Sequence, residues 1–555
     1  MDENKTEHIL LISLFTLIIF PLLYVARLAD DNTFTSWKWV FSEINILHIF
    51  LFLVIGTSVA FAFSRLSLSG PYSPLFLFVF SFAGILPLWN EPESIIDASR
   101  YFLQAKSLKE YGIAYFFNEW GQDIDAWTDM PLIPFIYGLI FKFLGEVRAY
   151  IQAFTTLLFA STVVLTYFIG KILWDEETGF NAGLLLMGAP YLLMQVPLML
   201  VDVPAMFLVS LSIYTFLNAL KNGSHLWIIS SSLVISLTIF SKYSTMFMLS
   251  VLPVILIVSL KKDRKEIIFR TLKITIVTGL LSGLAVYAKH DLFLHQIEIL
   301  RTYQLSGLGR WQESFVSTFL FQTHPFLTVF AIYAAYKAIR DRDMRFLIAG
   351  WFVIFMVLLQ IKRIRYILPL FPLFTLMASY GLNEIKTKDI RRFISFCIVA
   401  SSLVIAFAGY LPFLSNTSME NIKKAGVYLD SLNCETVSVY ALPQKESDGN
   451  TLAVIPILDY FTDKRILSDQ DWSPHYNGKG VSKSSLRFTW EMKKPSFYSG
   501  HKQIGDCPSL VISSQKIDCQ NYFAKNGRQI TSNAIKTFYL SKDFFRFQTL
   551  ITICP

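Results

Sequence analysis

The sequence is poor in charged residues. Only 16% of its 555 residues are charged, whereas 53% are hydrophobic and the mean hydropathy is +0.47. A soluble protein carries about 25% charged residues, and a disordered chain combines low hydrophobicity with high charge, so both classes are excluded. Apolar runs of roughly 20 residues, the length that crosses a bilayer, recur along the chain. The composition therefore predicts a polytopic integral membrane protein.

Motifs that define several other classes are also missing. There is no Walker A loop, which excludes the usual ATP-driven pump, and no Gly-rich dinucleotide fingerprint. No zinc-finger or RNP spacing accompanies the net charge of +8, so we expect no nucleic-acid partner. The excess of basic residues instead fits the positive-inside bias of membrane proteins. No inverted repeat is visible, which argues against a secondary transporter.

The apolar runs predict about thirteen transmembrane helices. The predicted spans are 9–27, 46–64, 74–89, 149–172, 179–198, 203–220, 226–241, 244–260, 270–288, 315–336, 345–361, 365–382 and 392–411. With a cytoplasmic N-terminus, the basic clusters between these spans fall on the inner side. The chain then divides into two additional N-terminal helices (1–73), a membrane domain (74–414) with a large outer loop (90–148, loop 1), and an outer tail (415–555).

The tail has the composition of a small soluble domain. Runs at 436–440, 452–461 and 509–513 resemble strands, and Ser418 is a suitable cap for a helix over 418–432. About 140 residues suffice for one extracytoplasmic α/β domain. The tail holds four of the five cysteines: Cys434, Cys507, Cys519 and Cys554. They permit two disulfides in three pairings, and free buried thiols are an equally open alternative.

Loop 1 is rich in acidic residues and is long enough to favour a functional role over a spacer. Residues 97–108 predict an amphipathic helix at the membrane surface. Residues 131–144 are apolar but too few to span, so we expect an interfacial or re-entrant helix. If Glu93 and Asp97 share one helix, they lie on the same face, and their mutual repulsion would raise the pKa of one of them. A plain acidic surface is the alternative.

Five short strings resemble motifs of the GT-C glycosyltransferases, most closely the protein O-mannosyltransferases and the lipid A aminoarabinose transferases. In chain order they are Asp97-Ala-Ser-Arg-Tyr-Phe-Leu-Gln-Ala-Lys-Ser-Leu108, Asp129-Met-Pro-Leu132, Leu200-Val-Asp-Val-Pro204, Ser241-Lys-Tyr-Ser244 and Arg365-Tyr-Ile-Leu-Pro-Leu-Phe-Pro372. They cover roughly residues 74–385. The family's Asp-Glu pair is reduced here to Asp97-Ala98, and Met130 stands where the family often has His or Lys.

The resemblance implies a catalytic role for the acids. Asp97 would be the general base that takes a proton from an acceptor hydroxyl; otherwise it is a solvated interfacial carboxylate. Asp202 and Asp129 would shape the sugar and acceptor pockets. Each also reads as a helix start: Asp202 as an N-cap before Pro204, and Asp129 just ahead of Pro131. Glu93 is the fourth catalytic candidate.

The basic candidates point to a lipid phosphate. Arg365 lies on the predicted outer side, against the positive-inside trend, and arginine binds phosphate oxygens bidentately; snorkelling to headgroups is the alternative. Tyr366, Lys242 and Arg310 are further candidates for the same donor pocket. His290 and His295 have no partners at metal-ligand spacing, so no metal site is predicted. A divalent cation is left open as a cofactor, because carboxylates bind one together with phosphate.

The sequence thus predicts an α-helical polytopic membrane protein of GT-C type. By resemblance it moves a sugar from a polyprenyl-phosphate (dolichol-type) donor to a hydroxyl of a protein, glycan or lipid, with inversion. It would lie in the cell membrane of a prokaryote or in the ER membrane of a eukaryote. The alternatives are a transporter or lipid-sugar flippase without covalent chemistry, and a non-catalytic anchor for the outer tail.

Overall fold

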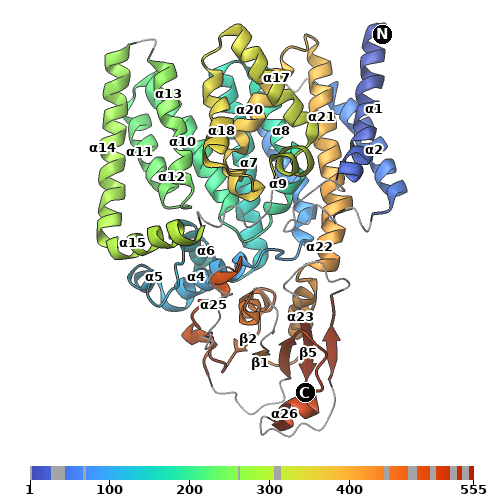
Figure 1. The fold of residues 1–555 in the computed structure, drawn as a ribbon, viewed down its shortest axis with the longest axis vertical. Coiled ribbons are helices and arrows are strands. Elements are labelled where there is room, and N and C mark those ends of the chain that lie inside the picture. The colour runs from blue at the N-terminus through green and yellow to red at the C-terminus, as the bar shows by residue number, and fades with distance from the viewer. Residues whose placement is uncertain are drawn as a thin grey trace.

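The computed structural model describes residues 3–26, 40, 44–66, 70–260, 263–304, 314–442, 449–472, 484–500, 508–525, 534–540 and 549–555. Its longer helices run side by side and together form one block, called here the helical layer. A small domain with a β-sheet projects from one end of this layer (Figure 1). Between the two parts lie the short helices of loop 1. The predicted fold class, a helical membrane protein with a small α/β C-terminal domain, is confirmed.

Seven helical segments in the described part of the chain are long and apolar enough to span a bilayer. They are Lys5–Val25 within α1 (Glu3–Ala26), α2 (Ile46–Ser64), Ser73–Asn90 comprising α3 (Ser73–Ile85) and η3 (Leu86–Asn90), α7 (Arg148–Leu173), α10 (Asp202–Asn222), α14 (Arg264–Ala288), and Lys388–Thr417 comprising α21 (Lys388–Ile405), η9 (Ala406–Tyr410) and α22 (Leu411–Thr417). The chain is therefore an integral, multi-pass membrane protein.

The other predicted spans are shorter or interrupted helices. The shorter elements are α11 (His225–Ile239), α12 (Thr245–Met248), α13 (Val251–Ser259), α17 (Pro325–Asp341), α18 (Phe346–Leu359), α19 (Ile364–Ile367), η8 (Leu368–Leu370) and α20 (Phe371–Leu382). The predicted span 179–198 divides into α8 (Glu176–Leu185), η4 (Leu186–Gly188) and α9 (Pro190–Gln195). Pro190 has no backbone N–H and cannot continue the helix that precedes it. The count of thirteen therefore stays a prediction.

Loop 1 forms three short helices: α4 (Asp97–Tyr111), α5 (Ile113–Glu119) and α6 (Leu132–Phe143). The helix expected over 97–108 is present, but it does not lie on a surface. Its residues from Ala98 to Ala105 are all buried, because α6 packs along one side and the C-terminal domain covers another. At twelve residues, α6 is too short to span, as its length predicted.

The C-terminal domain is built on a five-stranded sheet of order β2-β1-β3-β5-β4. Its elements are α23 (Glu420–Asp430), β1 (Thr436–Ala441), η10 (Thr451–Val454), α24 (Ile455–Asp459), β2 (Arg465–Leu467), α25 (Arg487–Trp490), η12 (Ser496–Tyr498), β3 (Ser509–Ser513), α26 (Cys519–Lys525), β4 (Lys536–Phe538) and β5 (Leu550–Cys554). β1 pairs in parallel with β2 and β3, and β5 pairs antiparallel with β3 and β4.

Two expectations for this domain are corrected, and the open question of its disulfides is answered in part. The apolar run 452–461 is helical rather than a strand, and Pro456 near the start of α24 suits the first turn of a helix. Ser418 does not cap α23, whose preceding residue is Met419 in a left-handed conformation. One disulfide joins Cys519 to Cys554; Cys507 lies outside the described residues, so a second pairing is not settled.

The two ends of the helical layer differ. The N-terminus, the start of α14 and the α17–α18 connection lie at the end away from the C-terminal domain (Figure 1). Basic residues stand at these places, such as Lys265 at the start of α14 and Arg345 in the α17–α18 connection. Basic residues therefore mark one end of the helical layer, and loop 1 with the C-terminal domain lies at the other, as the charge pattern predicted.

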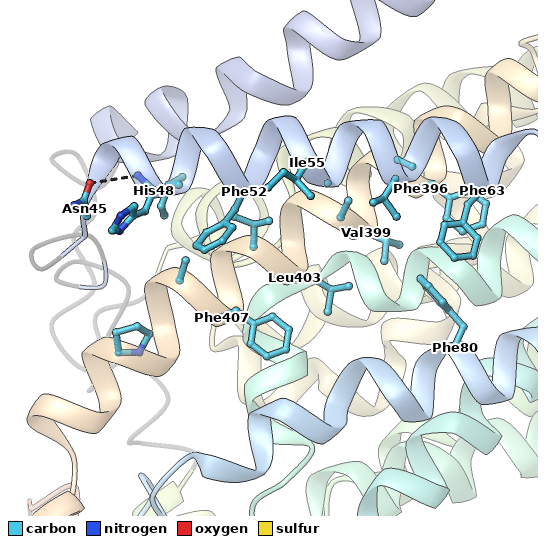
Figure 2. Close-up of a pocket in the computed structure, with 18 residues that line it drawn as sticks. Asn45, His48, Phe52, Ile55, Phe63, Phe80, Phe396, Val399, Leu403 and Phe407 are labelled. Atoms are coloured by element: carbon cyan, nitrogen blue, oxygen red, sulfur yellow. Dashed lines mark hydrogen bonds between the residues drawn. The ribbon is translucent and has the colours of Figure 1, made fainter.

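An apolar groove of about 750 Å³ runs along the contact between α2 and α21 and reaches α3 (Figure 2). Phe52, Phe80, Phe396 and Leu403 contribute to its walls, and Asn45 with His48 lies at one end. The second N-terminal helix thus meets the membrane domain along an incompletely filled seam. None of the candidate site residues lines this groove.

Candidate functional site

Helix α4 carries two charged residues of the site on one face. Asp97 is its first residue, where a carboxylate is favoured by the helix dipole. Arg100 follows one turn later, and its Nη2 lies 3.6 Å from Oδ1 of Asp97. Asp97 keeps a partly accessible side chain, 23% exposed, whereas Arg100 is almost fully buried. The acid is therefore the group of this pair that a solute can reach.

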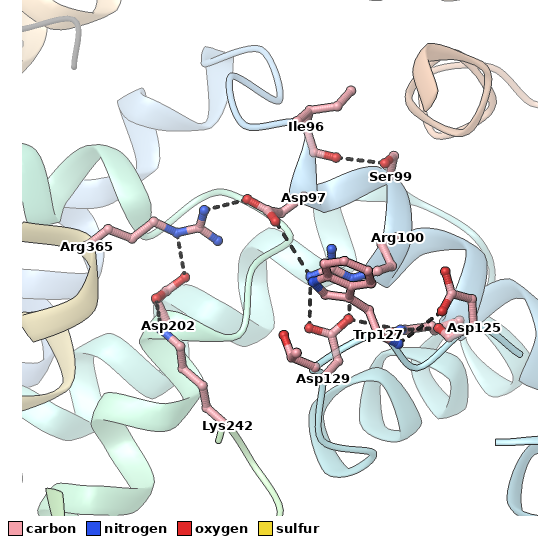
Figure 3. A network of polar contacts seen from close by, with 12 residues as sticks. Ile96, Asp97, Ser99, Arg100, Asp125, Trp127, Asp129, Asp202, Lys242 and Arg365 are labelled. Atoms are coloured by element: carbon pink, nitrogen blue, oxygen red, sulfur yellow. Dashed lines mark hydrogen bonds and ion pairs between the residues drawn. The ribbon is translucent and has the colours of Figure 1, made fainter. Parts of the chain in front are cut away.

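Arg365 joins Asp97 to a second carboxylate (Figure 3). Its Nη1 donates to Oδ2 of Asp97 over 2.5 Å, and its Nε donates to Oδ2 of Asp202 over 3.2 Å. Arg365 lies on α19 and Asp202 begins α10, so two membrane-domain segments and loop 1 converge here. Lys242, between α11 and α12, donates to Oδ1 of Asp202 over 2.5 Å. A planar guanidinium suits this bridging geometry because it has donors on two edges.

Asp129 completes the network from the other side of Arg100. The guanidinium contacts both of its oxygens: Nε donates to Oδ2, and Nη2 donates to Oδ1 over 2.9 Å. Nε2 of Gln104 also donates to the Asp129 carboxylate over 3.0 Å, and Nε2 of Gln296 donates to its carbonyl over 3.0 Å. Asp129 is therefore held rigidly, while its contact to Asp97 passes through Arg100.

The helix-start interpretations of Asp202 and Asp129 are wrong in detail. Asp202 is the first residue of α10, but no side-chain hydrogen bond caps that helix, and its carboxylate is used on Arg365 and Lys242. Asp129 precedes α6, whose cap position is Pro131 without a side-chain bond. In both cases the side chain pairs with a distant cation, which a local sequence pattern does not reveal.

The expected pairing of Glu93 with Asp97 is also wrong. Glu93 lies ahead of α4 in irregular backbone, so the two acids do not share a helix. Its Oε1 accepts from Nε of Arg148 over 3.1 Å, and its Oε2 accepts from the backbone N–H of Met199 over 3.2 Å. Glu93 is fully buried and ties the start of α7 to the segment before α10. Burial raises its pKa, and Arg148 opposes that rise.

Two of the remaining donor-pocket candidates lie together. Lys242 Nζ lies 6.0 Å from the ring centre of Tyr366. Arg363 also contacts Tyr366, with Nη1 3.3 Å from the phenol oxygen. Arg310 falls outside the described residues. Lys242 and Arg363 thus both lie near the Tyr366 side chain, and Arg365 precedes Tyr366 on α19.

Ionisation differs sharply between two acids of loop 1. Burial alone would raise the pKa of Asp97, but Arg365 and Arg100 lower it to about 2. Asp97 is therefore a carboxylate at neutral pH. Burial raises the pKa of Asp125 to about 6, and the nearby Arg100 only partly opposes that effect. Asp125 Oδ1 accepts from the N–H of Trp127 over 3.0 Å.

Metal ligation finds little support in the described part of the chain. It contains no group of three or more His, Cys, Asp or Glu side chains that could hold an ion. Nε2 of His290 contacts Asp291 over 3.0 Å, and both side chains are exposed. Oδ2 of Asp97 and Oδ2 of Asp202 both accept from Arg365. A divalent cation as cofactor stays a prediction.

Sequence reasoning missed Arg100, Gln104, Asp125 and Gln296 as members of this network. Arg100 had a detectable signal: it stands three residues after Asp97 in a predicted helix, a spacing that places two side chains on one face. Gln296 comes from α15 (His290–Ile299), which is remote in sequence and meets loop 1 only in the fold. No spacing rule could have found it.

The whole fold resembles that of a solved membrane enzyme. ArnT from Cupriavidus metallidurans bound to undecaprenyl phosphate matches with a TM-score of 0.54 and 11% identity, covering 87% of this chain and 98% of that chain. Its apo structure gives the same TM-score at 10% identity, covering 86% and 97%. The archaeal oligosaccharyltransferase AglB from Archaeoglobus fulgidus, with an inhibitory peptide and a dolichol-phosphate, scores 0.49 at 12% identity, covering 82% and 70%.

The likeness to ArnT defines the class of fold: the chain has the GT-C type fold that its motifs indicated. More particularly, residues 129–290 match the family model described as dolichyl-phosphate-mannose-protein mannosyltransferase. That segment begins at Asp129 and includes Asp202 and Lys242. No curated protein matches the sequence significantly.

Proposed function

We propose that this protein is a membrane glycosyltransferase. It moves a sugar from a polyprenyl-phosphate donor to a hydroxyl of a protein, glycan or lipid, with inversion at the anomeric carbon. One observation carries the proposal: Arg365 bridges Asp97 and Asp202 where loop 1 meets the ends of the membrane helices. A base and a phosphate-binding cation thus lie in direct contact, beside the hydrocarbon that would hold a lipid chain.

The roles follow from charge and access. Asp97 is ionised and partly exposed, so it accepts the proton of the acceptor hydroxyl as that oxygen attacks the sugar. Arg365 exchanges its contact with Asp97 for the donor phosphate and stabilises the charge that builds up as the lipid phosphate leaves. Asp202, which also accepts from Lys242, keeps Arg365 in place, and Asp129 does the same for Arg100.

The likeness to ArnT supports a lipid-linked donor. That protein was crystallised with undecaprenyl phosphate, the kind of molecule that a polyprenyl-phosphate sugar leaves behind. The site lies at the same end as the C-terminal domain and opposite the basic connections (Figure 1). With the positive-inside bias, both belong on the outer face of a prokaryotic cell membrane, or on the lumenal face of the ER.

The test is transfer by the purified protein with a panel of synthetic polyprenyl-phosphate monosaccharides. Asp97→Asn removes the base without changing size, so we expect transfer to fall by about 10²- to 10⁴-fold while folding is kept. Asp123→Asn is the matched control, because Asp123 is an exposed acid of the same loop outside the network. Near-normal transfer by Asp97→Asn contradicts the assigned base.

Mass spectrometry of glycolipids and glycoproteins, with and without the protein, identifies the sugar and the acceptor. The same assay repeated with a chelator and with added Mg²⁺ or Mn²⁺ decides whether a divalent cation takes part. If the protein scrambles or imports the lipid-linked sugar into liposomes and forms no covalent product, the proposal fails in favour of a flippase.

A further inference from the structure

One turn of the C-terminal domain lies directly against the network. Phe488 on α25 is buried, and its ring centre lies 4.5 Å from the guanidinium carbon of Arg100. Arg100 belongs to α4 in loop 1, so two segments far apart in the sequence meet at this contact. A guanidinium stacked on an aromatic face is attracted by the ring and fixed in its plane.

Arg100 is held on its edges as well as on its face. Its Nε and Nη2 donate to the carboxylate of Asp129, and Nη2 also lies 3.6 Å from Oδ1 of Asp97. Within the described residues, nothing accepts a hydrogen bond from its buried Nη1. The carboxylates therefore leave part of the guanidinium unconstrained. The ring of Phe488, at 4.5 Å, is a closer restraint than the ring of Tyr101, at 5.3 Å.

The segment around Phe488 is itself anchored to loop 1 and its neighbours. The hydroxyl of Tyr303 donates to the carbonyl of Ser484. Arg487 lies 5.6 Å from the ring centre of Trp127. Nζ of Lys493 donates to the carbonyl of Gln122 over 2.6 Å. These contacts lie on both sides of Phe488 in the chain, so its place over Arg100 is fixed by more than one interaction.

A second set of contacts joins the domain to α4 itself. Nζ of Lys106 donates to Asp459 of α24 over 2.7 Å, and the hydroxyl of Tyr498 contacts the same carboxylate over 2.7 Å. Lys106 lies on the same helix as Asp97, further toward its C-terminal end. The C-terminal domain therefore contacts α4 at two places along the helix, and the contact nearer Asp97 is the stack of Phe488 on Arg100.

We propose that Phe488 is a positioning residue of this site: its ring holds Arg100 in the plane that aligns Asp97 for proton transfer. The domain beyond the membrane thus takes part in the chemistry through one side chain that does not touch the substrate. This inference rests on the proposed function, because it assigns Phe488 a role only if Asp97 is the base.

The test compares Phe488→Leu, which keeps apolar bulk but removes the aromatic face, with Phe488→Tyr, which keeps the face. We expect the Leu variant to lower kcat about 2- to 30-fold, the range of a partly to fully desolvated cation–π contact. The KM for the donor stays near its wild-type value, because Arg365 binds the phosphate. The Tyr variant recovers most of the lost rate. If Phe488→Leu does not fold, Phe488→Met replaces it.

The matched control is Phe523→Leu on α26, at the far end of the same domain (Figure 1). Phe523 is equally buried and packs on Tyr440, away from loop 1. It should lose thermal stability without losing kcat. A double variant with Arg100→Lys should lose little more kcat than Arg100→Lys alone, because both changes act through one contact.

Equal kcat values for Phe488→Leu and Phe523→Leu, failure of the Tyr variant to restore kcat, or full additivity with Arg100→Lys would each overturn the role of Phe488. Absence of transfer by the wild-type protein with every donor would overturn the proposed function instead. The two failures are therefore distinguishable in one set of assays.

Discussion

Asp125 is a buried acid of loop 1 whose charge depends on pH. Burial raises its pKa to about 6, whereas in the unfolded chain it titrates near 4. A raised folded-state pKa favours the protonated native form. The associated stability is therefore fully present below about pH 4 and is lost as pH rises through 6. By the usual conversion the loss is on the order of 2–3 kcal/mol.

We accordingly predict that Asp125→Asn removes part of the pH dependence of stability. Between pH 4 and 7 the Tm of the wild-type protein should fall relative to that of the variant, since the amide does not titrate. Other buried acids titrate in this range, so the difference between the two Tm curves is the quantity to measure. Parallel curves would show that Asp125 is ionised in the native state throughout.

At the scale of elements, the close approach of α7 and α8 depends on glycine. The Cα of Gly179 on α8 would lie 2.7 Å from a Cβ on Gly170 of α7, and a Cβ on Gly179 would clash with the backbone carbonyl of Tyr167. Small residues at such crossings let helices in membranes pack tightly. This packing holds α7 in place, and the first residue of α7, Arg148, pairs with the buried Glu93 of loop 1.

We expect Gly179→Ala to destabilise the protein by about 1–3 kcal/mol, the usual cost of overpacking, and to lower its Tm in detergent. Gly283→Ala on α14 is the control, because a Cβ there has open space around it. That change should be neutral or slightly stabilising, since alanine favours helix more than glycine does. Equal effects of the two substitutions would show that α7 and α8 can move apart.

The elements that sequence predicted well have strong local signals. The apolar runs predicted a membrane protein, and the strand-like runs at 436–440 and 509–513 predicted β1 and β3. The predictions failed where a contact with a residue far away in the sequence determines the local structure. Asp202 looked like a helix cap but pairs with Arg365, and 452–461 looked like a strand but packs as helix against α4. Motif resemblance singled out Asp97, Asp202 and Arg365, which the structure joins through two ion pairs. No local pattern predicts those contacts, because they join segments far apart in the chain.

For the whole molecule, the orientation in the membrane is the property that charge predicts most directly. The basic connections lie at one end of the helical layer, and the site and the C-terminal domain lie at the other. Basic loops are retained in the cytoplasm during insertion. We therefore predict that the C-terminal domain and loop 1 lie on the same, outer side.

Labelling tests this orientation. Lys424→Cys on α23 and Lys265→Cys at the start of α14 both replace exposed residues. In intact cells, a membrane-impermeant maleimide should label the first variant and should label the second only after permeabilisation. The parent protein gives the background from its own cysteines. The reverse pattern would place the site on the cytoplasmic side and exclude an outer acceptor.

The closed network has a consequence for turnover. In it, three carboxylates, those of Asp97, Asp129 and Asp202, contact three cations, those of Arg100, Lys242 and Arg365. A phosphodiester donor brings one negative charge to this balanced site. The lipid phosphate that remains after transfer is a monoester and carries up to two. If the protein is the glycosyltransferase proposed above, we expect the spent lipid to be held more tightly than the donor, and its departure, rather than sugar transfer, to be the slow step of the cycle.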